Sequence, residues 1–233
     1  PFRAFATATS LDDGRIAVAG GLEEDAVTAS DEIRYFEPSL IAFAGTAKLG
    51  APRAGHAAQL VRVGNTMQLW VGGSVAQFGT DRDDATPALT STEFFLPMTG
   101  AVTAGPQLSE PRVLAESVVF AVDNEDGDHD RVMVIGGYTR RSATAHGAGA
   151  GTSGSGDVID VVKPATTTSV VARAGRAGAA VAKSPSGGRV MAFGGFSVST
   201  PTGSACNGQD IDLLVPCEDE FNPVTMTHLV SQS

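Results

Sequence analysis

The sequence predicts an all-β fold built from four four-stranded antiparallel units. Glycine and proline are frequent, with 28 and 12 of 233 residues, and both interrupt long helices. Apolar runs of five to eight residues, bounded by turn residues, suit strands better than helices. The same succession of segments occurs four times along the chain. We therefore expect one all-β domain over residues 1–233.

Each unit opens with an arginine that leads an apolar segment. These arginines fall 50, 59 and 64 residues apart, at Arg3, Arg53, Arg112 and Arg176. The segments that follow them are rich in alanine and glycine, which suits a crowded strand close to an axis. The spacing divides the chain into units of about 1–50, 51–110, 111–174 and 175–233.

The second segment of each unit ends in a pair of glycines. The pairs are Gly20 and Gly21, Gly72 and Gly73, Gly136 and Gly137, and Gly194 and Gly195. The residues before each pair are apolar at nearly every position, as expected of a central strand that is covered on both faces. The glycine pair therefore marks the end of a second, buried strand.

The third segment of each unit closes on a proline. These segments are 33–38, 93–97, 159–164 and 212–216. Proline is tolerated there because the chain is already leaving the ladder of hydrogen bonds. A weaker fourth segment then runs to the next arginine.

Long connections join the second and third segments, over 22–31, 74–91, 138–156 and 196–209. Loops of this length in a compact domain often carry function. Because the units repeat, we expect the loops to emerge on one face and to form a continuous surface. Tolerated insertions explain their length equally well.

This arrangement resembles the kelch repeat, in which each four-stranded unit is one blade of a β-propeller. The glycine pairs are the matching motif, and the resemblance covers all four units. Trp70 lies on the second strand, whereas kelch blades often carry a tryptophan on the outer strand. The resemblance implies a kelch-type propeller of four blades that is part of a larger ring. A closed ring of four blades is the second choice.

The charge of the chain argues against two classes of partner. Its net charge is −10 and its pI is about 4.7, so it repels nucleic acid and anionic lipid surfaces. No apolar window reaches the length of a membrane span, so we expect no membrane insertion. Lysine occurs only at Lys48, Lys163 and Lys183, which is typical of proteins from GC-rich bacterial genomes.

The two cysteines bear on the compartment. Cys206 and Cys217 lie eleven positions apart, and we predict a disulfide between them. Two free thiols in a cytosolic protein are the alternative. A disulfide implies an oxidising compartment, so the expected location is extracellular, at the cell surface or periplasmic. Zinc is disfavoured because no Cys-x-x-Cys and no nearby histidine pair is present.

One acidic segment is a weak candidate for Ca²⁺. Five carboxylates lie close together there, from Asp123, Glu125, Asp126, Asp128 and Asp130. Their spacing does not match the calcium-binding loop of the EF-hand, and an acidic, solvated turn is the preferred interpretation. We therefore expect no cofactor.

The resemblance to kelch proteins supplies a scaffold and leaves the ligand open. We expect an exported, bacterial, non-enzymatic binding or scaffold protein whose loops engage a protein or a surface polymer. An enzyme with an axial site of galactose-oxidase-like or lyase type is one alternative. Another is a structural subunit that assembles outside the cell through unpaired blade edges. No catalytic residues are assigned from the sequence.

Overall fold

The computed structural model of this chain describes residues 3–75, 88–122, 129–138, 153–162, 167–171, 175–184, 189–195, 218–222 and 227–232. These residues form sixteen strands and no helix, so the all-β prediction is confirmed. None of them belongs to a helix that could cross a membrane.

The strands form four sheets, and each sheet contains four strands that are consecutive in the chain. The first sheet contains β1 (Thr7–Ser10), β2 (Ile16–Ala19), β3 (Glu32–Glu37) and β4 (Ala42–Lys48). The second contains β5 (Ala57–Val63), β6 (Thr66–Gly72), β7 (Thr92–Leu96) and β8 (Ala101–Ala104). The third contains β9 (Glu116–Val122), β10 (His129–Ile135), β11 (Ser155–Asp160) and β12 (Thr167–Val171). The fourth contains β13 (Ala180–Lys183), β14 (Val190–Phe193), β15 (Glu218–Asn222) and β16 (Thr227–Gln232).

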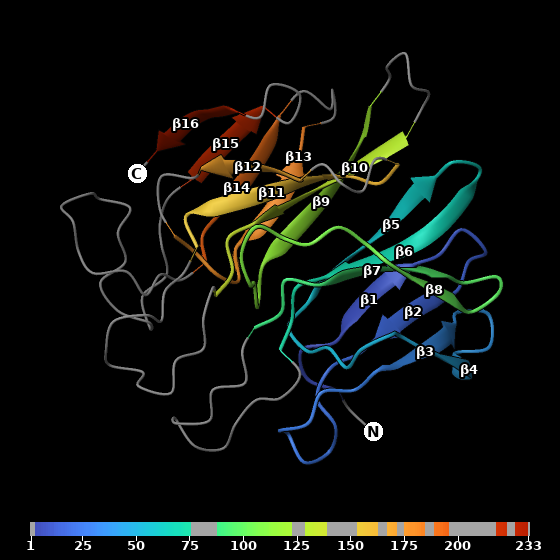
Figure 1. Ribbon diagram of the computed structural model, residues 1–233. Helices are drawn as coiled ribbons and strands as arrows, with labels where there is room; N and C mark the ends of the chain where they lie inside the picture. Colours follow the sequence, from blue (N-terminus) through green and yellow to red (C-terminus); the bar gives the residue numbers. More distant parts are fainter. Residues whose placement is uncertain are drawn as a thin grey trace.

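Every neighbouring pair within a sheet is antiparallel, and the order of strands in each sheet follows the chain. Figure 1 shows the sheets side by side in chain order, with β1, β5, β9 and β13 of successive sheets facing one another. No closed ring of sheets is detected in the described part of the chain.

One of the predicted third strands was wrong in position. β11 begins at Ser155, four residues before the predicted segment 159–164. The closing proline misplaced this segment because apolar residues precede the proline, whereas β11 begins with Ser155, Gly156 and Asp157. The predicted third segment of the fourth unit, 212–216, lies outside the described residues, and β15 begins at Glu218.

The hydrophobic core consists of separate clusters between neighbouring sheets. Leu69 and Val71 of β6 pack in a cluster with residues of the first sheet, whereas Trp70 packs in a cluster with residues of the third. Successive side chains of a strand point to opposite faces, so a strand between two sheets needs apolar residues on both faces. This explains the continuous apolar run before the glycine pairs of the second and third sheets. A third cluster joins Met133 of the third sheet to Val190 of the fourth.

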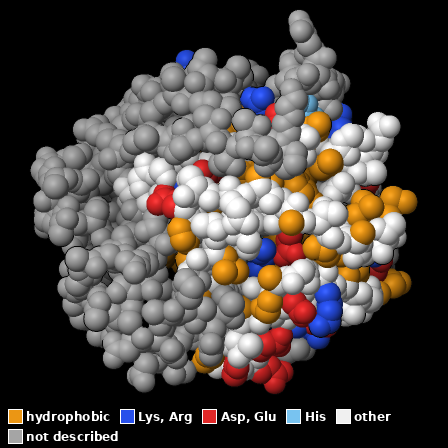
Figure 2. Space-filling model, in the orientation of Figure 1, with side chains coloured by type: hydrophobic (Ala, Val, Ile, Leu, Met, Phe, Trp, Pro, Cys, Tyr) orange, Lys and Arg blue, Asp and Glu red, His pale blue; other side chains and the backbone are white. Residues whose placement is uncertain are grey.

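The outer hairpins of the first two sheets carry exposed large hydrophobic side chains. Leu40, Ile41 and Phe43 lie at and after the β3–β4 turn, and Met98 lies in the β7–β8 turn. Figure 2 shows hydrophobic side chains spread over the visible face among polar and charged ones. No single apolar patch dominates this view.

Candidate functional site

The arginine that opens each unit binds the glycine pair of its own sheet. In every unit the Nη1 atom donates to the carbonyl of one glycine. The distances are 3.3 Å from Arg3 to Gly20, 2.8 Å from Arg53 to Gly73, 2.7 Å from Arg112 to Gly136 and 3.3 Å from Arg176 to Gly194. The first segment is thereby fixed to the end of the second strand. We call this arginine, with the groups that it binds, the arginine clamp.

In the second and third sheets the clamp also reaches the third strand. Nη1 of Arg53 donates to the carbonyl of Ser91 at 3.0 Å, just before β7. Nη1 of Arg112 donates in the same way to the carbonyl of Ser155 at 3.0 Å, at the start of β11. Each of these arginines therefore holds both ends of the long connection between the second and third strands.

A buried carboxylate completes the clamp in the same two sheets. Nε of Arg53 lies 2.7 Å from Oε1 of Glu93, and Nε of Arg112 lies 3.0 Å from Oδ2 of Asp157. The second oxygen of each carboxylate accepts a backbone N–H three residues before the arginine. These bonds measure 2.7 Å to Gly50 in the second sheet and 3.2 Å to Ser109 in the third. The carboxylate therefore orients the guanidinium and also fixes the chain that leads to it.

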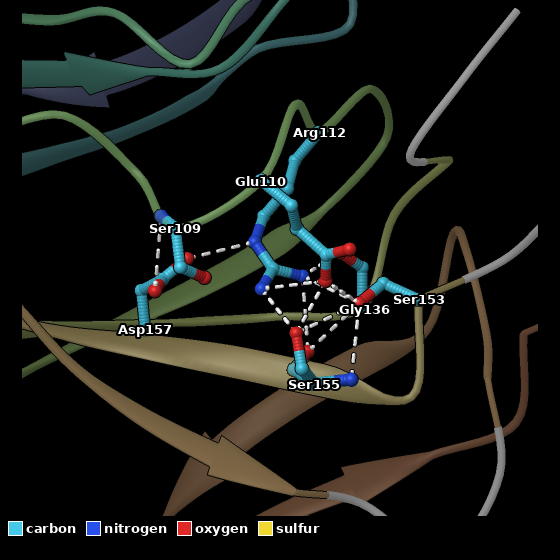
Figure 3. Close-up of polar contacts among 7 residues, drawn as sticks. All are labelled: Ser109, Glu110, Arg112, Gly136, Ser153, Ser155 and Asp157. Atoms are coloured by element: carbon cyan, nitrogen blue, oxygen red, sulfur yellow. Dashed lines mark hydrogen bonds and ion pairs between the residues drawn. The ribbon is translucent and has the colours of Figure 1, made fainter.

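Figure 3 shows the clamp of Arg112. Its guanidinium also donates to the hydroxyls of Ser153, at 2.9 Å, and Ser155, at 2.6 Å. The carboxylate of Glu110 lies 3.1 Å from Nη2 and accepts hydrogen bonds from both serine hydroxyls. The guanidinium therefore donates charge-assisted hydrogen bonds to five acceptor atoms. These bonds restrict the freedom of both ends of the loop.

A short motif in the sequence marks these clamps, and the sequence analysis missed it. The second and third sheets contain a serine followed two residues later by an acid, as Ser91 and Glu93 and as Ser155 and Asp157. In the first sheet Glu32 occupies the serine position and lies 2.5 Å from Nη2 of Arg3. The acid position there is Arg34, so Nε of Arg3 finds no hydrogen-bond partner among the described residues.

The glycine pair also joins each sheet to the next one. The N–H of Gly21 donates to the carbonyl of Arg53 at 2.8 Å, and that of Gly137 donates to the carbonyl of Arg176 at 2.7 Å. The equivalent donor in the second sheet is Ser74, whose N–H lies 2.8 Å from the carbonyl of Arg112. The pair in that sheet is therefore Gly73 and Ser74.

The predicted motif of the second unit is thus displaced by one residue, because Gly72 is the last residue of β6. The first member of each pair has a positive φ, at 61° for Gly20 and 68° for Gly73. A Cβ atom added to either residue would lie 2.3 or 2.4 Å from the carbonyl oxygen of the next unit's arginine. Glycine is required there by the conformation and by this close approach.

A second set of backbone hydrogen bonds joins the first segments of successive sheets. In each bond, the donor and the acceptor come from two neighbouring units, and each is the residue two positions after the arginine of its own unit. The bonds measure 2.9 Å from Gly55 to Phe5, 2.7 Å from Leu114 to Gly55 and 2.9 Å from Gly178 to Leu114. All four residues have a left-handed φ between 55° and 65°. These bonds hold the first segments in line along the inner side of the array.

A cavity of about 370 Å³ lies between the first strands of the first three sheets. Its polar lining includes Thr7, His56, Gln59, Glu116 and Ser117. Nε2 of His56 lies 2.9 Å from the hydroxyl of Thr7, and the amide of Gln59 donates to the carbonyl of Ser117 at 2.8 Å. The lining therefore brings together one acidic group, one imidazole and several hydroxyl and amide groups.

Burial shifts the pKa values of both titratable groups in this cavity. Loss of water around the carboxyl of Glu116 raises its pKa to about 7. Burial, and to a smaller extent the charge of Arg53, lowers the pKa of His56 to about 3. At neutral pH the imidazole is therefore uncharged, and the carboxyl of Glu116 is poised between its two forms.

Both cysteines and four of the five carboxylates predicted from the sequence lie outside the described residues. They are Cys206 and Cys217, and Asp123, Glu125, Asp126 and Asp128. Asp130 lies in β10, and its carboxylate accepts the backbone N–H of Arg62 at 2.6 Å, so it links the third sheet to the second. Among the described residues, no group of three or more His, Cys, Asp or Glu side chains is placed to hold a metal ion.

The sequence matches no protein-family profile and no curated protein.

Proposed function

We propose that this chain is a kelch-type, propeller-like binding scaffold, exported by a bacterium, that engages a protein or a surface polymer through the long loops between its second and third strands. The observation that carries the proposal is the arginine clamp. In two sheets a buried arginine binds both ends of such a loop, at Gly73 and Ser91 and at Gly136 and Ser155. Binding loops are commonly mounted on rigid scaffolds in this way.

The position of the clamp supports a common binding surface. Each clamped loop leaves its sheet at the same point, directly after the glycine pair, and successive glycine pairs are joined by the hydrogen bonds to the next arginine. Neighbouring loops therefore start from bases that are fixed relative to one another. In the second and third sheets, the buried ion pair inside the clamp restricts the freedom of these bases further. A continuous surface of loops suits an extended partner, such as a protein or a polymer.

A loop-replacement experiment tests the proposal. Residues 139–152 are replaced by a glycine–serine linker of the same length, which leaves the clamp of Arg112 unchanged. The matched control replaces Met98 and Thr99, in the turn between β7 and β8 at the other end of the second sheet. Binding is measured on arrays of glycans and of extracellular proteins. We expect at least one array component to bind the natural chain and the control but to lose affinity for the loop variant.

Catalysis would contradict this function. Reproducible turnover of a panel of sugars, alcohols and lactones, with metal content near one per chain, would replace the binding scaffold by an enzyme. Binding that is equal for the natural chain and the loop variant would also contradict the role given to the loops.

The cavity favours an enzyme with an axial site as a second candidate. Glu116 has a pKa of about 7 and lies beside Ser117 in a cavity between three sheets. A carboxyl with a pKa near the working pH is suited to donate and accept protons. The same substrate panel, applied to the natural chain and to Glu116→Gln, tests this candidate. Turnover that Glu116→Gln abolishes would support it, whereas turnover that is unchanged would exclude Glu116 as the acid or base.

A further inference from the structure

The glycine pair of the fourth sheet lacks the contact that the pairs of the other three sheets make. A Cβ atom added to Gly20, Gly73 or Gly136 would lie 2.2 to 2.4 Å from the carbonyl oxygen of the next arginine. A Cβ atom added to Gly194 would meet nothing within 4 Å among the described residues, although its φ of +64° matches the others. The fourth sheet therefore presents a preformed socket for an arginine-led segment that none of the described residues fills.

Two backbone groups at this socket have no hydrogen-bond partner in the described part of the chain. One is the N–H of Gly195, which is buried and is equivalent to the donors of Gly21 and Gly137. The other is the carbonyl of Gly178, equivalent to the carbonyls of Phe5 and Gly55 that accept from the next unit. A buried N–H without a partner is costly, so a segment that supplies the missing acceptor would be bound favourably.

The opposite end of the array offers the complementary group. The carbonyl of Arg3 has no partner among the described residues, whereas the carbonyls of the three other unit-opening arginines each accept from the preceding sheet. Arg3 itself is held in place by its clamp on Gly20 and Glu32. The first sheet therefore presents, in a fixed position, the acceptor that the fourth sheet lacks.

Half-buried apolar side chains lie on the outer faces of the first and fourth sheets. On β14, Val190 and Ala192 pack against the third sheet, so the alternation of the strand directs Met191 and Phe193 to the other face. On β2, Ala17 and Ala19 pack in the cluster shared with the second sheet, which directs Ile16 and Val18 to the other face. At the equivalent positions of β6 and β10, the side chains pack in clusters between neighbouring sheets. Both end faces therefore match the interfaces already present between the sheets.

We propose that a second copy of this chain docks on the fourth sheet, head to tail, with its first sheet in the place of a following unit. The N–H of Gly195 then donates to the carbonyl of Arg3 of the second copy, which continues the series of hydrogen bonds seen at the three inner interfaces. Such a contact joins different surfaces of the two copies, so it is repeated until the assembly closes. Two copies that bind at both ends close a ring with twice the four sheets of one chain, a size of about eight blades that propellers are known to reach.

Gly194→Ala tests the socket with little effect on the isolated sheet. The added methyl meets open space within the described residues of one copy, but it would collide with the docked arginine carbonyl, as it would at the three inner interfaces. Gly64→Ala is the matched control, because Gly64 also has a left-handed φ, of +59°, and open space around it, but lies in the β5–β6 turn. Both substitutions carry the same conformational cost.

The molar mass of the full chain is measured by size-exclusion chromatography with light scattering, over a wide range of concentration. We expect a mass of at least two chains for the natural protein and for Gly64→Ala, and a loss of this species for Gly194→Ala. Phe193→Glu is a second variant that places a charge on the docking face, and we expect it to be monomeric as well. Circular dichroism establishes that each variant is folded.

Two results would overturn the proposal. One is a natural chain that stays monomeric over the whole range of concentration. This includes a monomer that closes on itself and thereby protects the amide of Gly195. The other is an assembly that persists unchanged in both Gly194→Ala and Phe193→Glu. Neither result would affect the loop-binding function proposed above, which is tested on the loop of the third sheet.

Discussion

Arg112 and Asp157 form an ion pair in which neither side chain is exposed to water, with Nε and Oδ2 separated by 3.0 Å. The two residues lie 45 positions apart in the chain and join the first segment of the third sheet to β11. The remaining donors of the guanidinium are used by the carbonyls of Gly136 and Ser155 and by serine hydroxyls. A buried pair of this kind leaves an uncompensated charge when one partner is removed.

Asp157→Asn should therefore lower the free energy of unfolding by up to about 3 to 5 kcal/mol, because Arg112 loses its fully buried counter-charge and keeps only the partly exposed carboxylate of Glu110. The control is Asp13→Asn, since Asp13 pairs with Arg15 at 2.6 Å but both side chains are substantially exposed. An exposed pair contributes roughly 0.2 to 1 kcal/mol. Urea denaturation measures both values. Equal losses in the two variants would show that the pair of Arg112 and Asp157 is not buried.

Gly136→Ala should destabilise the chain far more than Gly64→Ala. Both residues have a left-handed φ, of +69° and +59°, so both substitutions carry the conformational cost of about 1 to 2 kcal/mol for a side chain there. The added methyl of Gly136→Ala would also lie 2.2 Å from the carbonyl oxygen of Arg176, whereas that of Gly64→Ala meets nothing within 4 Å. Thermal unfolding of the two variants compares them. A similar midpoint for both would argue against the contact between the third and fourth sheets.

The carboxyl of Glu116 should make the stability of the chain fall as the pH rises. Its pKa is raised from 4.5 to about 7 in the folded state, so the folded chain binds more protons than the unfolded chain between these values. Stability is lost through this window, and the loss is complete above the folded pKa. His56, whose pKa is lowered to about 3, acts in the opposite direction between about 3 and 6.5.

Glu116→Gln separates the two effects, because His56 is the same in both proteins. The free energy of unfolding of the variant, relative to the natural chain, should rise between about pH 4 and about pH 8. Urea denaturation at both pH values provides the comparison. A difference that does not change with pH would mean that Glu116 is not desolvated in the cavity.

The disulfide between Cys206 and Cys217 stays a prediction, because both residues lie outside the described residues. If the chain functions outside the cytosol, the denatured, unreduced protein should take up no alkylating reagent, and reduction should expose two thiols. Closing a loop of this length stabilises a fold by about 3 kcal/mol in the loop-entropy model, so reduction should also lower the unfolding midpoint. Two thiols that react without reduction would remove the disulfide and the main argument for export.

The sequence predicted the fold best where burial on both faces imposed a continuous apolar run. The second strands end at or within two residues of the predicted glycine pairs, because β6 and β10 pack in clusters on both faces and β2 and β14 on one. The third strands were harder to predict. β11 carries the buried Asp157, which is polar in the sequence and becomes a core residue only through its pairing with Arg112.

The clamps could not be predicted from local pattern for the same reason. Glu93 and Asp157 lie 40 and 45 residues from their arginines, so the pairing depends on the register of strands that the pattern does not fix. The serine two residues before each acid was the available signal, but the first sheet departs from it with Glu32 and Arg34. The displacement of the second glycine pair had a related cause: Gly72, Gly73 and Ser74 are all small residues, and only the φ angles and the bond to Arg112 show which two form the pair.

The central claim is that each glycine pair fastens its sheet to the arginine that opens the next, and amide hydrogen exchange measured by NMR tests it most directly. The N–H groups of Gly21, Ser74 and Gly137 donate to the carbonyls of Arg53, Arg112 and Arg176. We predict that these three amides exchange as slowly as those of the buried strands β6 and β10, whereas the amide of Gly64, in an exposed turn, exchanges fast. Exchange of Gly21, Ser74 and Gly137 at the rate of Gly64 would contradict the account.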